Sequence, residues 1–124
     1  MNDVVLTVLI AGLLPIVCAG IAKWGAKGYD NQQPREWLAQ QEGHRARANA
    51  AQQNSFEAFP LFAAGVALAW LSEVELEDIA QCGWFFIAMR LVYIYCYVTN
   101  QATWRSVSWA LGLAAVLRLY VLAI

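Results

Sequence analysis

Four long apolar runs alternate with polar segments along the chain. Crossing the hydrocarbon core of a bilayer as a helix takes about 20 largely apolar residues, and each run approaches that length. The runs cover residues 4–22, 48–71, 79–99 and 106–123. The second and third connections are short, so the helices that they join should be antiparallel. This pattern predicts an all-α integral membrane protein in which residues 1–124 form one domain, a four-transmembrane-helix bundle.

Composition supports a membrane protein and excludes several other classes. Hydrophobic residues make up 60% of the chain and charged residues 14%, and the mean hydropathy is +0.46. No small-residue cleavage pattern follows the first apolar run, so we expect that run to be a retained helix rather than a signal peptide. A net charge of -1 offers no broad basic surface for nucleic acid. The three cysteines lack metal-ligand spacing, so no metal site is expected.

The charges in the connections predict an orientation. Six of the eight Lys and Arg residues lie in the first and third connections, whereas the second, "SEVELED", holds four acids and no base. Basic connections stay on the cytoplasmic side of a membrane. We therefore expect a multi-pass protein of the inner (cytoplasmic) membrane, with the first and third loops in the cytoplasm and both termini outside.

Polar residues inside the second and third spans fall on single helix faces. Asn54 and Glu57 are three residues apart, and Arg90, Tyr93 and Tyr97 follow the same helical spacing on the third span. Counted from the acidic loop at 1.5 Å per residue, Glu57 and Arg90 differ by only about 5 Å in depth. The sequence therefore predicts an ion pair between these two residues.

Two interpretations of this predicted pair remain open. A charge at mid-bilayer costs at least about 2.5–3.5 kcal/mol, so both residues should face protein. In the first interpretation, the pair serves only to fix the register of the two helices. Alternatively, the neutral donors and acceptors around it line a polar cleft that opens toward the cytoplasm.

The fourth span begins with "WRSVSW", which places Arg105 and Ser106 at a predicted helix N-terminus. Unpaired N–H groups and the helix dipole favour an anion at such a position. A guanidinium would add carboxylate or thiolate recognition and would lower the pKa of a bound thiol. The alternative is that Arg105 is an ordinary basic anchor at the end of a span.

Three local patterns, in order, resemble the MAPEG superfamily, the membrane-associated proteins in eicosanoid and glutathione metabolism. They are "RANAAQQNSFEAFPLF" on the second span, "RLVYIYCY" on the third and "RSVSW" at the start of the fourth. The resemblance covers nearly the whole chain and is greatest to bacterial-type microsomal glutathione transferases. It implies a homotrimer with three clefts between subunits, in which glutathione meets an apolar small molecule or lipid from the membrane.

The resemblance also implies roles for individual residues. Arg105 and Ser106 would be catalytic, because they would stabilise the thiolate of glutathione, the co-substrate. Arg90 would pair with Glu57 while facing the ligand. The implied binding residues are Asn54, Glu57, Arg90, Tyr93 and Tyr97. The leading hypothesis is thus a glutathione transferase or peroxidase whose thiolate attacks a lipophilic electrophile or hydroperoxide.

Two other functions remain open. Ala50 and Gln53 stand where catalytic relatives carry basic residues. This difference favours a non-catalytic lipid-binding or scaffold protein on the same fold, as the lipoxygenase-activating member of the family is. A small transporter with a proton relay through Glu57 is permitted by a carboxylate within a span, but no second acid is placed to receive the proton.

Overall fold

A computed structural model describes all 124 residues and contains five helices and no strand. The helices are α1 (Asn2–Lys23), α2 (Pro34–Ala39), α3 (Gly43–Leu71), α4 (Leu76–Val98) and α5 (Ala102–Ala123). All except α2 are long and apolar enough to cross a membrane. The predicted all-α, four-span fold class is confirmed.

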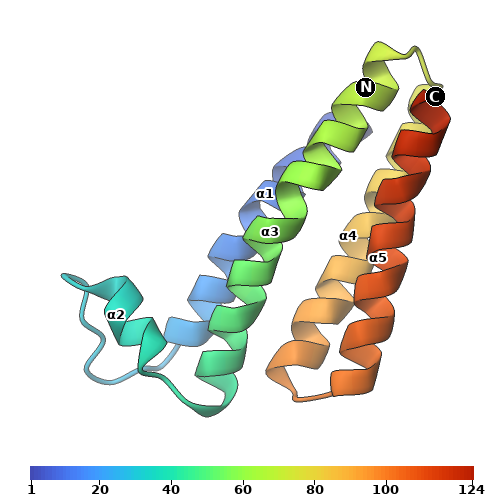
Figure 1. The fold of residues 1–124 in the computed structure, drawn as a ribbon. Helices are drawn as coiled ribbons and strands as arrows, with labels where there is room; N and C mark the ends of the chain where they lie inside the picture. The colour runs from blue at the N-terminus through green and yellow to red at the C-terminus, as the bar shows by residue number, and fades with distance from the viewer.

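The four long helices form two antiparallel pairs that pack side by side (Figure 1). The most extensive contacts join α1 to α3 and α4 to α5. Both termini lie near the α3–α4 connection, and we call this the acidic end of the bundle because of its carboxylates. The opposite end carries α2 and the α4–α5 turn, and we call it the basic end.

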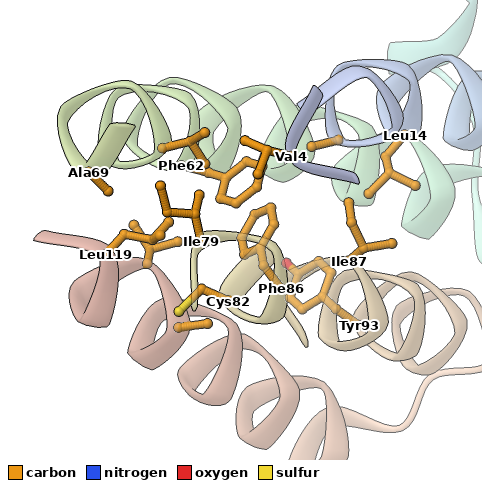
Figure 2. Packing of buried hydrophobic residues seen from close by; sticks show 14 of the residues in the cluster. Val4, Leu14, Phe62, Ala69, Ile79, Cys82, Phe86, Ile87, Tyr93 and Leu119 are labelled. Carbon is orange, nitrogen blue, oxygen red and sulfur yellow. The ribbon is translucent and has the colours of Figure 1, made fainter. Parts of the chain in front are cut away.

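The core lies between all four long helices (Figure 2). At its centre Phe62 of α3 stacks on Phe86 of α4, with ring centroids 4.2 Å apart and an interplanar angle of 14°. Ile79 and Leu119 are fully buried beside them. Because lipid tails are as apolar as these side chains, close packing rather than exclusion from water holds such helices together.

All four long helices begin before the apolar runs that predict them, and the difference is largest for α3 and α5. The apolar run of the second span starts at residue 48, but the sequence leaves open whether the helix itself starts there or as early as residue 35. In the structure α3 begins at Gly43, which has a positive φ of 61° and follows the short helix α2. The fourth span is expected from residue 106, but α5 begins at Ala102, directly after a turn in which Asn100 has a φ of 61°. Asn adopts this left-handed conformation more readily than most residues. These first turns are polar, so hydropathy alone does not mark them.

Two arginines near the start of α3 cap the C-terminal ends of α1 and α4. Arg45 Nη1 donates to the carbonyls of Ala22 (2.8 Å) and Trp24 (3.0 Å) at the end of α1. Arg47 Nε donates to the carbonyl of Val98, the last residue of α4, over 3.1 Å. The last carbonyls of a helix have no partner within it, and a cation also favours the helix dipole there. These two basic residues therefore tie α1 and α4 to α3.

A close approach between α1 and α4 depends on a glycine. A Cβ built on Gly83 would lie 2.6 Å from Thr7 Oγ1 and 2.9 Å from Thr7 Cβ. Thr7 cannot readily turn away, because it is fully buried and its hydroxyl donates to the Val4 carbonyl over 2.8 Å. Small residues allow membrane helices to approach this closely.

We expect Gly83→Ala to destabilise the bundle. Overpacking a closely packed site costs about 1–3 kcal/mol, more than the gain in helix propensity from replacing glycine. Gly112→Ala is the matched control, because a Cβ there would meet its nearest neighbour, Met89 Cβ, at 3.6 Å, an ordinary contact. Thermal unfolding in detergent, followed by tryptophan fluorescence, should show a lower midpoint for Gly83→Ala only. Equal midpoints would contradict this account of the crossing.

Candidate functional site

A cavity of about 220 Å³ lies between α3, α4 and α5. Its lining divides into a polar part and an apolar part. The polar residues are Asn54, Glu57 and Arg90, and the others are Ala58, Leu61, Phe86, Trp109, Gly112, Leu113 and Val116. The cavity therefore offers charged and amide groups beside a hydrocarbon surface, a combination suited to a ligand that has both characters.

Arg90 is the centre of the polar part and is only 3% exposed. Its Nη1 donates to Asn54 Oδ1 over 2.8 Å, and its Nη2 donates to Ser55 Oγ over 3.1 Å. The guanidinium carbon lies 4.2 Å from the centroid of the Tyr93 ring. All three of these contacts are made with neutral groups. The positive charge is therefore hydrogen-bonded but not neutralised, and it borders the cavity.

The predicted ion pair between Glu57 and Arg90 is wrong for the single chain. Glu57 is exposed at the cavity, and the only ion pair in the chain joins Arg118 Nη2 to Asp78 Oδ1 over 3.3 Å. The depth estimate takes no account of how α3 is rotated about its axis. Ser55 faces α4, and Glu57, two residues later, points about 200° further round the helix. Arg90 therefore reaches Asn54 and Ser55 instead.

An aromatic path connects Arg90 to the basic end of the bundle. The rings of Tyr93 and Tyr97 meet edge to face, with centroids 5.6 Å apart. The guanidinium carbon of Arg105, on α5, lies 4.4 Å from the centroid of Tyr97. Arg90 and Arg105 thus make cation–π contacts at opposite ends of a tyrosine pair on α4. The structure brings Asn54, Arg90, Tyr93, Tyr97 and Arg105 into one continuous set of contacts.

Arg105 and Ser106 do not lie at the unpaired N-terminus of a helix, and this part of the sequence prediction is wrong. Because α5 begins at Ala102, the backbone N–H of Arg105 already donates to the Gln101 carbonyl over 3.0 Å. The unpaired amides belong to the residues of the first turn of α5 that precede Arg105. Ser106 is exposed and makes no side-chain hydrogen bond within the chain. Recognition of an anion here must therefore depend on side chains, the guanidinium of Arg105 and the free hydroxyl of Ser106, rather than on unpaired backbone amides.

Ser55 is the residue of this site that sequence reasoning missed. It is 3% exposed and supplies one of the two hydrogen bonds that hold Arg90. A signal was present, because Ser55 is the only hydroxyl residue between positions 48 and 71 and it adjoins Asn54. A polar side chain within a span usually faces protein and finds a partner there. Such a residue is a candidate partner for a charge on a neighbouring helix.

We expect Ser55→Ala to lower the free energy of unfolding by about 1.5–3 kcal/mol, because it leaves a donor of a buried cation unpaired. Ser108→Ala is the matched control. Ser108 is equally buried at 3% exposure, but its hydroxyl only donates to the Arg105 carbonyl of its own helix. Unfolding of both variants in detergent checks the difference. Similar small losses for the two would show that Ser55 does not support Arg90.

Comparison with known proteins gives one result. A search of the curated proteins found no significant match. The sequence profile described as the MAPEG family matches residues 4–124. The match includes every residue of the cavity and of the tyrosine pair, all of α3, α4 and α5, and α1 from Val4 onward. This chain, a multi-pass integral membrane protein, therefore belongs to the MAPEG family.

Proposed function

We propose that this protein is a membrane glutathione transferase or peroxidase of the bacterial microsomal type. Glutathione binds at the cavity between α3, α4 and α5, and an apolar molecule or lipid approaches from the membrane. The observation that carries the proposal is the charge of Arg90, which has no anionic partner, in the polar part of a cavity whose remaining lining is apolar. An anionic, polar co-substrate and a lipophilic one can meet there.

Each group of the site has a role in this proposal. Glutathione carries two carboxylates, one ammonium and one thiol. Arg90 and Asn54 donate to a carboxylate, and Glu57 accepts from the ammonium. Tyr93 and Tyr97 line the tripeptide between the two arginines. Arg105 stabilises the thiolate electrostatically, and Ser106, exposed one residue further on, donates to the same sulfur.

The chemistry requires no covalent bond to the protein. In the transferase reaction the thiolate forms a C–S bond with the electrophile, whose leaving group departs with its electron pair. In the peroxidase reaction the thiolate attacks a hydroperoxide oxygen and the O–O bond breaks, which yields an alcohol and a sulfenic acid of glutathione. A second glutathione reduces the sulfenic acid to a disulfide and water. A moderately lowered thiol pKa is best, because a very low one weakens the nucleophile.

We also propose that the working unit is a homotrimer in the inner membrane, with the basic end of the bundle in the cytoplasm. Glu57 supports an oligomer, since a single chain leaves this carboxylate exposed at membrane depth, where charge is costly. A second copy packed beside α3 and α5 would cover it. The excess of Lys and Arg at the basic end supports the orientation.

A second candidate function is a non-catalytic lipid-binding or scaffold protein on the same fold. The specific observation in its favour is that Ala50 and Gln53, on α3 before Asn54, provide no cation. Fewer cations would weaken the grip on a ligand with two carboxylates. Binding of glutathione by the purified protein separates the two functions.

We expect the purified protein to bind glutathione saturably at millimolar concentration and to conjugate it to a generic aryl halide. We expect Arg105→Ala to lose at least nine-tenths of this turnover. This loss follows from removing the charge that stabilises the thiolate. Lys27→Ala removes one cation from an exposed loop at the same end and should leave turnover unchanged. Size-exclusion chromatography checks that the oligomer persists. Absence of saturable binding would overturn the transferase hypothesis, and full turnover in Arg105→Ala would remove the thiolate site.

We expect Glu57→Gln to fold normally and to bind glutathione about 10–100-fold more weakly, as the loss of a hydrogen bond between charged groups predicts. Normal folding is expected because the partners of Arg90 are Asn54 and Ser55. Glu36→Gln, on the exposed face of α2, is the control with no expected effect on affinity. The measurements are calorimetric binding and the unfolding midpoint. A variant that fails to fold would give Glu57 a structural role instead.

A further inference from the structure

A second hollow lies between α4 and α5, on a different face of the pair from the first cavity. It encloses about 440 Å³ and shares no lining residue with the site described above. We call it the α4–α5 groove. Its lining residues are Gln81, Cys82, Phe85, Leu111, Ala114, Ala115 and Arg118. Nothing in the proposed reaction uses this groove.

The groove is polar at one end and apolar along the rest of its length. Arg118 and Gln81 lie toward the acidic end, where α5 finishes and α4 begins. Phe85 and Leu111 lie deeper, and seven residues of α5 from Arg118 to Leu111 span about 10 Å. A charge near a helix end reaches the level of the lipid head groups, whereas the deeper residues face hydrocarbon.

The shape of the groove comes from small side chains. Cys82 and Ala115 are buried in its floor, at 3% and 7% exposure. Phe85 and Leu111 are 45% and 43% exposed. The small residues therefore leave a hollow beside two larger apolar side chains. An alkyl chain lying there would make dispersion contacts that an unfilled hollow lacks.

The polar end carries both signs of charge. Arg118 uses one of its five N–H donors within the chain, in the 3.3 Å contact with Asp78, and its side chain is 53% exposed. Glu77 lies beside Asp78 and accepts from Gln81 Nε2 over 3.4 Å. One cation with two adjacent carboxylates favours a head group that is itself both negative and positive. A purely anionic head group would be repelled by the carboxylates of this end.

We propose that the α4–α5 groove binds one zwitterionic phospholipid with a primary ammonium head group. The phosphate accepts from the free guanidinium donors of Arg118, and the ammonium donates to Asp78 and Glu77. One acyl chain follows the groove past Ala114 toward Leu111. This proposal is independent of glutathione binding at the first cavity.

The test measures how added lipid raises the unfolding midpoint of delipidated protein in detergent, since a ligand stabilises the folded state that binds it. We expect phosphatidylethanolamine to raise the midpoint at concentrations at least tenfold lower than phosphatidylglycerol or phosphatidylcholine require. Arg118→Gln removes the phosphate contact and Ala114→Phe fills the hollow, and each should abolish this preference. Because an exposed ion pair contributes little to stability, Arg118→Gln should still fold.

Arg35→Gln removes an exposed arginine from α2 and is the matched control, with the lipid preference expected to persist. If Ala114→Phe fails to fold, Ala114→Leu replaces it as the groove-filling variant. An equal response to the three lipids would overturn the proposal, as would a preference that persists in both groove variants. Cross-linking of cysteines placed at Ala114 in two chains would show that a second copy covers the groove, and this result would also overturn it.

Discussion

The burial of one cation, Arg90, is the constraint on which the rest of this site depends. A guanidinium at membrane depth must be hydrogen-bonded, or its helix would not insert stably. The chain meets this requirement with an amide, a hydroxyl and an aromatic ring, which come from α3 and from α4 itself. Because none of these groups is anionic, Arg90 keeps its full charge while it joins the two helices. The same contacts therefore hold α3 against α4 and provide hydrogen-bond partners for the buried charge.

The choice of neutral partners has a consequence for Glu57. A carboxylate paired with Arg90 would have cancelled both charges and closed the polar part of the cavity. Instead Glu57 makes no ion pair, so the cavity is lined by a cation and an anion that do not neutralise each other. The contrast with Arg118 and Asp78 is instructive. That pair lies at a helix end and is about half exposed, where water and lipid head groups supply much of the solvation and a direct contact contributes little.

Much of the fold follows from hydropathy, because a helix that crosses lipid must be apolar over most of its length. The ends of the helices do not follow, since Gly43 and Asn100 act through backbone conformation at polar positions. Five of the seven predicted site residues form one connected series of contacts. Helical spacing predicts the part of the series on α4, where Arg90, Tyr93 and Tyr97 share one face. The partner of Arg90 could not be found in this way. Spacing and depth give the height of a residue, whereas helix rotation decides whether Ser55 or Glu57 faces α4.

The periodicity of α5 explains how one helix borders two separate hollows. Trp109, Gly112 and Val116 line the first cavity, whereas Leu111, Ala115 and Arg118 line the α4–α5 groove. These sets interleave along the sequence but lie on different faces, as a period of 3.6 residues requires. Both hollows also adjoin α4, through Phe86 on one side and Phe85 on the other. A molecule in the groove would therefore contact faces of α4 and α5 other than those that border the cavity, and it would not compete for the space beside Trp109.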